Sequence, residues 1–165
     1  MTTPSIKDQV WLNAPATRTV MDALLTNGGA ARFVGGCVRN ALLGVEVSDI
    51  DIATPLTPDE VVRRIEAAGM RAVPTGIEHG TVTVLARGLP IEVTTFRGEG
   101  EYADGRRPGS VTFHTDLEAD LARRDFTMNA LAYDPVGQTF RDPFGGRADM
   151  KARRVRAVGD PAARF

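Results

Sequence analysis

The chain has 165 residues, a length that fits one ordinary domain or one domain with a short appendage. Hydrophobic residues make up 42% and charged residues 25%, so the chain can bury a core and is not expected to be disordered. The net charge of −1 excludes binding to nucleic acid through an overall positive charge. The single cysteine, Cys37, excludes an internal disulfide and a cluster of zinc-binding thiolates.

Neither a membrane segment nor a secretion signal is expected. No apolar run approaches the roughly 18 residues of a membrane span, and the N-terminus lacks a basic region followed by an apolar one. The expected location is therefore cytoplasmic, and the oligomeric state stays open. All basic residues except Lys7 and Lys151 are arginines. This preference suits phosphate recognition, although a GC-rich genome would produce it as well.

Short helices and strands alternate in the first third of the chain. Residues 17–29 space their apolar side chains as a helix does, and a glycine pair can end it. Residues 31–36 read as a short apolar strand, and residues 37–44 as a short helix closed by a glycine. Residues 47–54, VSDIDIAT, alternate with the period of a strand.

Residues 57–69 predict another helix, with a threonine N-cap, a proline in the first turn and a capping-box glutamate. Residues 81–96 predict two strands joined by a hairpin turn at residues 87–90. No periodicity survives in residues 97–110, a glycine-rich charged stretch typical of a mobile or functional loop.

The last part of the chain returns to helix over residues 116–134, with a break near Arg124 that would make two helices. Residues 138–158 then predict a short strand, a turn, a short helix and a final strand. The element order indicates an α/β protein with helices beside a small, mixed, largely antiparallel sheet. Residues 1–30 are expected to be an N-terminal helical segment and residues 31–150 the main domain.

A glycine pair, Gly35 and Gly36, lies between a predicted strand and a predicted helix. Glycines there let the backbone approach a ligand closely, and the amides of the helix N-terminus favour an anion. Arg39, on the first turn of that helix, can add a charge-assisted contact. The alternative is an ordinary glycine turn without a ligand.

Three carboxylates occupy strand positions. Asp49 and Asp51 are expected on one face of their strand, where they repel each other unless a cation lies between them. Mg²⁺ prefers such hard oxygen ligands and is commonly held by one or two carboxylates plus substrate phosphates. Glu92 lies in a second strand that could bring it beside the pair. The alternative for each is a solvated strand position.

The segment RRDFTMN places Arg123, Arg124, Asp125 and Asn129 just before or within a helical run. It mixes cationic donors with one acidic acceptor. A ligand-binding cluster and a solvated helix end are both compatible with this pattern.

Taken together, these motifs resemble the head domain of the class II tRNA nucleotidyltransferase and bacterial poly(A) polymerase family. The resemblance rests on GGCVRNALLG, DID, HGTVTV…IEVTTFR, RRDFTMNAL and DPFGG, in that order between residues 31 and 165. It implies a polymerase β-like nucleotidyltransferase head that transfers a nucleoside monophosphate from CTP or ATP to the 3′ hydroxyl of tRNA or another RNA. Pyrophosphate would be released.

The resemblance also implies roles for the acidic residues. Asp49 and Asp51 would be catalytic and would hold two Mg²⁺ ions, and Glu92 matches the position of a third acidic residue. Residues 97–110 resemble the flexible head loop of the family, which is thought to help organise the site for the last nucleotide.

Five residues would bind the nucleotide by the same resemblance. The glycine turn and the first helix would contact the triphosphate, the later arginine would contact the bound nucleotide, and the aspartate after it would lie near the ribose. These residues are Gly35, Gly36, Arg39, Arg124 and Asp125.

Two features depart from the family pattern. Asn40 stands where the family usually has an aspartate, which affects a supporting interaction more than metal binding. The chain also stops near the point where the helical neck with its base-selecting motif would begin, so residues 151–165 would lead into that neck. A head alone is expected to bind Mg²⁺–nucleotide weakly and to discriminate poorly among bases.

Other functions stay open on sequence alone. The family's CCA-adding and poly(A)-adding members share this head, so the motifs do not separate the two activities. A non-catalytic nucleotide- or RNA-binding module of the same fold is the main rival. A domain that uses only the glycine turn to bind phosphate leaves the strand positions of Asp49, Asp51 and Glu92 without an explanation.

Overall fold

A computed structural model describes residues 5–98, 112–113 and 116–159 of the chain. Its strands, in chain order, are β1 (Arg32–Val34), β2 (Ile50–Thr54), β3 (Arg71–Gly76), β4 (Thr81–Ala86), β5 (Leu89–Thr95), β6 (Arg97–Gly98), β7 (Thr112–Phe113), β8 (Ala132–Asp134) and β9 (Thr139–Arg141). Its α-helices are α1 (Val10–Asn13), α2 (Pro15–Leu25), α3 (Gly36–Leu43), α4 (Pro58–Ala67), α5 (Leu117–Ala122) and α6 (Gly146–Lys151). Short 3₁₀ turns are η1 (Ile6–Asp8), η2 (Thr26–Gly28), η3 (Ile77–His79) and η4 (Thr127–Asn129).

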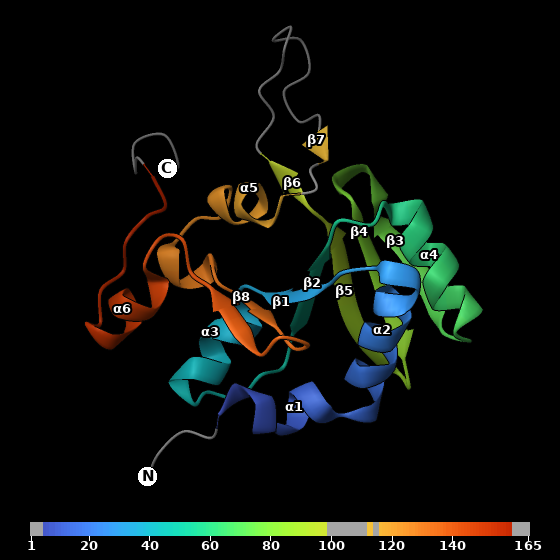
Figure 1. Ribbon diagram of the computed structural model, residues 1–165, viewed down its shortest axis with the longest axis horizontal. Helices are drawn as coiled ribbons and strands as arrows, with labels where there is room; N and C mark the ends of the chain where they lie inside the picture. The colour runs from blue at the N-terminus through green and yellow to red at the C-terminus, as the bar shows by residue number, and fades with distance from the viewer. Residues whose placement is uncertain (1–4, 99–111, 114–115, 160–165) are drawn as a thin grey trace, which may run out of the picture.

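Seven strands form one sheet in the order β3-β4-β5-β2-β1-β8-β9, while β6 and β7 pair separately (Figure 1). The pair β2–β5 is parallel, and the other pairs of the sheet are antiparallel. The prediction of an α/β fold with a mixed, largely antiparallel sheet is confirmed. The sheet is larger than expected, because β3 and β8 were not among the predicted strands. No helix in the described part of the chain combines the length and apolar character needed to cross a bilayer.

The sheet separates two hydrophobic cores. Ile52 and Val93 point toward one core, which also contains Leu24 of α2. Ala53 points toward the other core, together with Leu121 of α5. Because side chains alternate along a strand, the residues next to the first core's members in β2 and β5 face the second side of the sheet.

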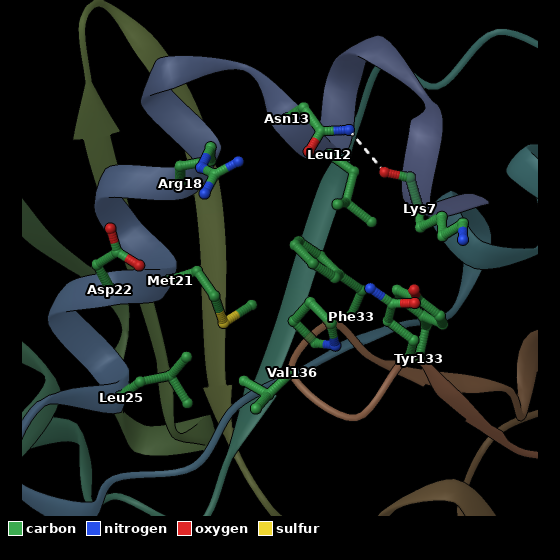
Figure 2. A pocket seen from close by; sticks show the side chains of 12 residues that line it. Lys7, Leu12, Asn13, Arg18, Met21, Asp22, Leu25, Phe33, Tyr133 and Val136 are labelled. Carbon is green, nitrogen blue, oxygen red and sulfur yellow. Dashed lines mark hydrogen bonds between the residues drawn. The ribbon is translucent and has the colours of Figure 1, made fainter. Parts of the chain in front are cut away.

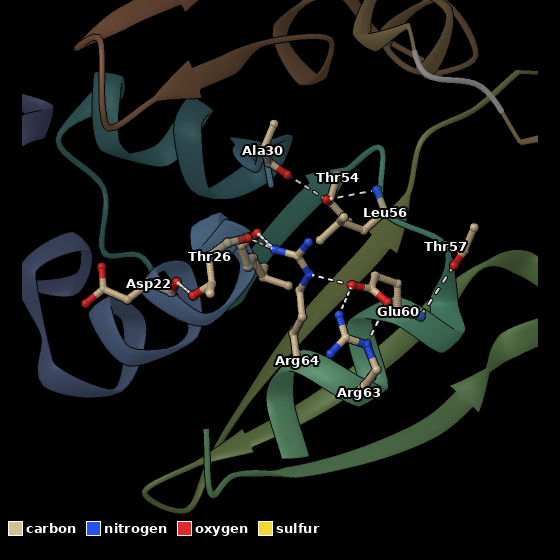
Figure 3. Close-up of polar contacts among 10 residues, drawn as sticks. Asp22, Thr26, Ala30, Thr54, Leu56, Thr57, Glu60, Arg63 and Arg64 are labelled. Atoms are coloured by element: carbon tan, nitrogen blue, oxygen red, sulfur yellow. Dashed lines mark hydrogen bonds and ion pairs between the residues drawn. The ribbon is translucent and has the colours of Figure 1, made fainter. Parts of the chain in front are cut away.

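Local chemistry explains helix α4 and its attachment. The hydroxyl of Thr57 accepts a hydrogen bond from the Glu60 amide at 3.3 Å, as the predicted N-cap requires. The Glu60 carboxylate pairs with Arg63 and Arg64 one turn later. Arg64 also donates to the carbonyl of Thr26 at the end of α2, so this cluster joins the two helices (Figure 3).

The hairpin between β4 and β5 is tighter than predicted. Arg87 and Gly88 alone form the turn, and both have positive φ angles, 51° and 80°. Such two-residue turns match the twist of the flanking strands. Leu89 and Pro90 already pair with β4, so the turn predicted over four residues occupies two.

Two predictions about the later chain are wrong. The second helix expected after Arg124 is absent from the described residues: α5 ends at Ala122, the single turn η4 follows, and the chain enters β8. β8 pairs with both β1 and β9, so sheet hydrogen bonds outweigh the local helical pattern. The expected final strand is reduced to one bridge between Phe126 and Ala157.

Strand β2 begins later than its sequence pattern suggested. Residues 45–49 are irregular, and the strand runs from Ile50. Asp51 therefore lies within the strand, whereas the exposed Asp49 precedes it. Most of the predicted loop at residues 97–110 lies outside the described residues; its first two residues form β6.

Candidate functional site

Asp51 and Glu92 lie side by side on neighbouring strands. They are direct partners in the parallel register of β2 and β5. Their strand neighbours Ile52 and Val93 are buried in the first core, so the two carboxylates face the other side of the sheet. The expectation that a second strand brings Glu92 beside the aspartates is confirmed for Asp51.

The environment of Asp51 disfavours its charge. Burial, followed by the nearby negative charge of Glu92, raises the pKa of this carboxyl to about 6. Arg124 acts in the opposite direction, and Asp49 adds a smaller repulsion. Asp49, Glu92 and Arg124 therefore all lie close enough to Asp51 to interact with it electrostatically. A bound cation would reduce the repulsion among the three carboxylates.

These carboxylates fit an ion that is only partly held by protein. Within the described residues, no three His, Cys, Asp or Glu side chains are arranged as a complete metal-binding set. Mg²⁺, however, retains several waters and typically takes one or two protein carboxylates, with phosphates supplying further oxygens. The two aspartates suit that coordination, and they do not suit an all-protein cage.

The five predicted nucleotide-binding residues meet in one cleft of about 340 Å³. The cleft is formed by the start of α3 and by the segment between α5 and η4. Its lining consists of Gly35, Gly36, Arg39, Arg123, Arg124, Asp125 and Asn129. Residues almost ninety positions apart in the chain are thus brought together in one cleft, which is lined by two glycines and three arginines.

Gly35 permits the close approach of the two segments. Its φ of 72° and ψ of −136° are rarely adopted by residues with a side chain. A Cβ atom at this position would lie 3.0 Å from Nη1 of Arg124. The amide of Gly35 donates to the carbonyl of Leu131, which ties the turn to the end of the arginine segment.

Arg39 spans the cleft from α3. Its Nη1 donates to Oδ1 of Asn129 at 2.7 Å, and its Nε donates to Oδ1 of Asn40 at 3.0 Å. Asn40 therefore keeps a supporting interaction, without the charge that an aspartate would add. The guanidinium is held in place by two neutral acceptors, so its charge is not neutralised by them.

Arg124 links the cleft to the carboxylates. Its Nη2 donates to Asp120 at 3.2 Å, and its charge lowers the pKa of Asp51. The Nε of Arg124 is buried and has no hydrogen-bond partner among the described residues. Asp120 was missed by the sequence interpretation. Its spacing of four residues from Arg124 was the available signal, but the same spacing is common in solvated helical pairs.

Asp125 stabilises the turn that follows. Burial acts to raise the pKa of Asp125, but hydrogen bonds from Asn129 Nδ2 and the Phe126 amide outweigh it and lower the pKa. The side chain is exposed and lines the cleft, so it can also meet a ligand.

The DPFGG motif helps to hold the 3₁₀ turn η4, which follows the arginine segment, in place. Asp142 accepts hydrogen bonds from the amides of Gly146 and Arg147 and so fixes the start of α6. From α6, the buried Asp149 accepts a hydrogen bond from Thr127 at 2.5 Å. The motif thus has a structural role in holding η4 against the cleft.

A second cavity of about 300 Å³ lies elsewhere, between α2, β1 and the turn after β8 (Figure 2). Phe33 and Met21 belong to the first core and form part of its wall. None of the predicted site residues lines it.

Comparison with known proteins relates this site to a family. A sequence model described as "Poly A polymerase head domain" matches residues 31–156. The chain is 52% identical over 147 residues to the CCA-adding enzyme of Anoxybacillus flavithermus, covering 89% of this chain and 36% of that enzyme. It is 49% identical over 156 residues to the CCA-adding enzyme of Bacillus pumilus, covering 93% and 38%.

Solved structures agree. The crystal structure of the Bacillus stearothermophilus CCA-adding enzyme in complex with CTP superposes with a TM-score of 0.77 and 42% sequence identity, over 92% of this chain and 35% of that one. A tRNA nucleotidyltransferase complexed with a primer tRNA and an incoming ATP analog gives a TM-score of 0.67 and 32% identity, over 85% and 39%. The chain thus spans between 35% and 39% of the length of these relatives.

Proposed function

Because the chain belongs to the poly A polymerase head domain family, we propose that it is the nucleotidyl-transfer head of an RNA 3′-terminal nucleotidyltransferase. Its substrates would be CTP and ATP, and its acceptor the 3′ end of a tRNA, as in the CCA-adding relatives. Transfer of the nucleoside monophosphate would release pyrophosphate.

One observation carries the proposal. The acidic pair Asp51–Glu92 and the cationic cleft are adjacent: Arg124 lines the cleft, and its charge lowers the pKa of Asp51. A nucleoside triphosphate requires this combination, because its phosphates need cations and the metal that accompanies them needs carboxylates. A site for phosphate alone would not require two carboxylates beside it.

Each half of the site has a separate task in this proposal. Asp49 and Asp51 would hold Mg²⁺, with two ions expected. The amide end of α3, reached through Gly35 and Gly36, would receive the phosphates together with Arg39. Arg124 would contact the triphosphate from the other side of the cleft, and the adjacent Asp125 would lie near the ribose.

The reaction is an in-line displacement at phosphorus. The 3′ oxygen of the RNA attacks the α-phosphorus, the bond from that phosphorus to the bridging oxygen breaks, and pyrophosphate leaves with the electron pair. The hydroxyl proton would pass to a base, for which Glu92, exposed and directly paired with Asp51 in the sheet, is available. Bound Mg²⁺ would supply charge neutralisation and a lower pKa for the attacking hydroxyl.

Calorimetric titration of the chain with CTP, ATP, GTP and UTP tests the proposal. We expect weak binding that requires Mg²⁺ and differs little among the four bases, because the cleft presents phosphate-binding groups. Asp51→Asn and Arg124→Gln should each abolish it. Asp22→Asn and Arg71→Gln, at exposed positions outside the site, are the matched controls. Binding that ignores Mg²⁺, or that survives both site substitutions, would refute the proposed function.

A further inference from the structure

Asp120 is a buried carboxylate at the junction of the two halves of the site. Its side chain is only 1% exposed. Oδ1 accepts hydrogen bonds from the Arg97 amide at 3.1 Å and from Arg123 Nε at 3.2 Å. Oδ2 accepts from Arg124 Nη2, also at 3.2 Å. A buried carboxylate is stable only with several hydrogen-bonding or charged partners. The partners of Asp120 belong to different parts of the chain.

The partners of Asp120 come from both halves of the site. Arg97 opens β6, two residues after the end of β5, the strand that carries Glu92. Arg124 lines the phosphate cleft. Asp120 therefore ties the chain that continues the carboxylate strand to the arginine that faces the ligand. Asp120 thus adds a side-chain link between these halves to the backbone pairing of β1 with β2.

The remaining donors of Arg124 show why its position matters. With Nη2 held by Asp120, Nη1 lies against Gly35 at the floor of the cleft. Nε is buried without a partner among the described residues. Because Nη1 and Nη2 belong to one rigid, planar group, the bond from Nη2 to Asp120 also determines where Nη1 lies in the cleft.

We propose that Asp120 is a positioning residue that orients Arg124 toward the polyphosphate of the bound nucleotide. The inference rests on the proposed function, and it deepens it. Asp120 does not touch the nucleotide. It holds the planar fork of Arg124 in one orientation and fixes its distance from the carboxylates of β2 and β5, so that one ligand can engage both. Arginine's fork makes that orientation decisive, because it binds phosphate in a defined geometry.

The chain contains a matched control. Glu60 pairs with Arg63 and Arg64, at the same spacings of three and four residues at which Asp120 pairs with Arg123 and Arg124. The Glu60 cluster joins α4 to α2 (Figure 3), and none of its residues lines the cleft. A variant at Glu60 thus removes ion pairs of the same sequence spacing, at a more exposed carboxylate, without changing the proposed site.

The variant Asp120→Asn is expected to fold while it loses the orientation of Arg124, so its effects on stability and on nucleotide affinity can be measured separately. The amide oxygen of asparagine can still accept from the Arg97 amide, whereas its NH₂ group would face Arg124 Nη2, donor against donor. We expect the melting temperature to report a folded protein and the affinity for Mg²⁺–CTP to fall by about tenfold or more, the size of effect typical when a supporting partner is removed. Glu60→Gln should leave the affinity within about twofold of the original.

A double-mutant cycle distinguishes this role from a general structural one. Arg124→Lys keeps the charge but removes the fork. If Asp120 acts through Arg124, Asp120→Asn should change the affinity of the Arg124→Lys chain by less than about twofold. The same loss in both backgrounds, or an unchanged affinity of Asp120→Asn in the original chain, would overturn the inference.

Two further outcomes are informative. If Asp120→Asn does not fold, Asp120→Glu takes its place: it keeps the charge, displaces the guanidinium by one methylene, and is expected to weaken Mg²⁺–CTP binding. Unchanged binding by that variant would overturn the inference. If the original chain binds no Mg²⁺–CTP at all, the proposed function fails, and the inference fails with it.

Discussion

Replacing Asp51 with asparagine is expected to stabilise the metal-free protein. Burial and the charge of Glu92 raise the pKa of Asp51 to about 6, from an ordinary value of 3.8. The ionised carboxylate is therefore disfavoured in the folded state relative to the unfolded one. Asparagine has nearly the same shape and no charge, so Asp51→Asn removes this cost, and it also removes a proposed metal ligand.

The magnitude follows from linkage between protonation and folding. A pKa of about 6 in place of 3.8 corresponds to at most about 3 kcal/mol. Because Asp51 is only half-buried, solvent screening reduces the expected effect to about 1–2 kcal/mol. For a chain of this length that equals roughly 3–6 °C in melting temperature.

The pH dependence has a defined sign. The folded state binds a proton at Asp51 more readily than the unfolded chain does. The stability that this proton contributes is fully present below about pH 4 and is lost as the pH rises through about 6. Asp51→Asn should therefore be more stable than the original at pH 7.5, and the difference should shrink toward pH 4.

Differential scanning fluorimetry with EDTA at both pH values measures this effect. Asp22→Asn, which changes an exposed aspartate of α2, should shift the melting temperature by less than about 1 °C. Millimolar Mg²⁺ should then stabilise the original protein and not Asp51→Asn. An Asp51→Asn protein that melts at or below the original temperature at pH 7.5 would show that ionised Asp51 does not destabilise the folded state.

Three further predictions concern the glycine turns and the cysteine. Gly35→Ala should cost roughly 1–3 kcal/mol in unfolding free energy, because of its positive φ and the nearby Arg124 guanidinium; urea denaturation checks this, and unchanged stability would contradict it. Gly146→Ala should also cost about 1–3 kcal/mol, because a Cβ there would lie 2.1 Å from the carbonyl oxygen of Thr127; an unaltered denaturation midpoint would be inconsistent with that packing. Burial raises the pKa of Cys37 to about 11, so Ellman's reagent at pH 8 should react slowly with the native protein and rapidly in denaturant; equal rates would show that the thiol is accessible.

Local signals explain why much of the fold was predictable. The end of α3 follows from Gly44, which adopts φ 72° and lets the carbonyl of Ala41 accept its amide. The start of α4 follows from the Thr57 cap. In both cases the residues that determine the boundary lie within a few positions of it.

Long-range pairing explains the errors. The segment that ends in Ala132 and Tyr133 has apolar residues compatible with a helix, yet it pairs with β1 on one side and β9 on the other. β3 was missed because its residues are half-exposed and carry little alternation. Its hydrogen bonds to β4 decide its conformation, and no local pattern reports them.

The candidate site likewise has some features that follow from local sequence and others that depend on long-range packing. Alternation in two apolar strands was sufficient to predict that Asp51 and Glu92 could lie side by side. The face of a strand on which a residue lies follows from its position within that strand alone. The buried contacts of Asp120 were not predictable, because its burial depends on how α5 packs against the start of β6. A helical spacing of four residues alone does not distinguish a buried positioning pair from an exposed one.

In the proposed function, the carboxylates and the cationic cleft bind one metal–nucleotide complex. Paramagnetic broadening by Mn²⁺ in the amide NMR spectrum, with a non-hydrolysable CTP analog present, reports on both parts of the site at once. We expect broadening centred on Asp49, Asp51 and Glu92, with simultaneous shifts of the Gly35 and Gly36 amides. Broadening centred elsewhere on the surface, or shifts of the glycine amides that persist unchanged in Asp51→Asn, would show that the two parts do not bind one complex.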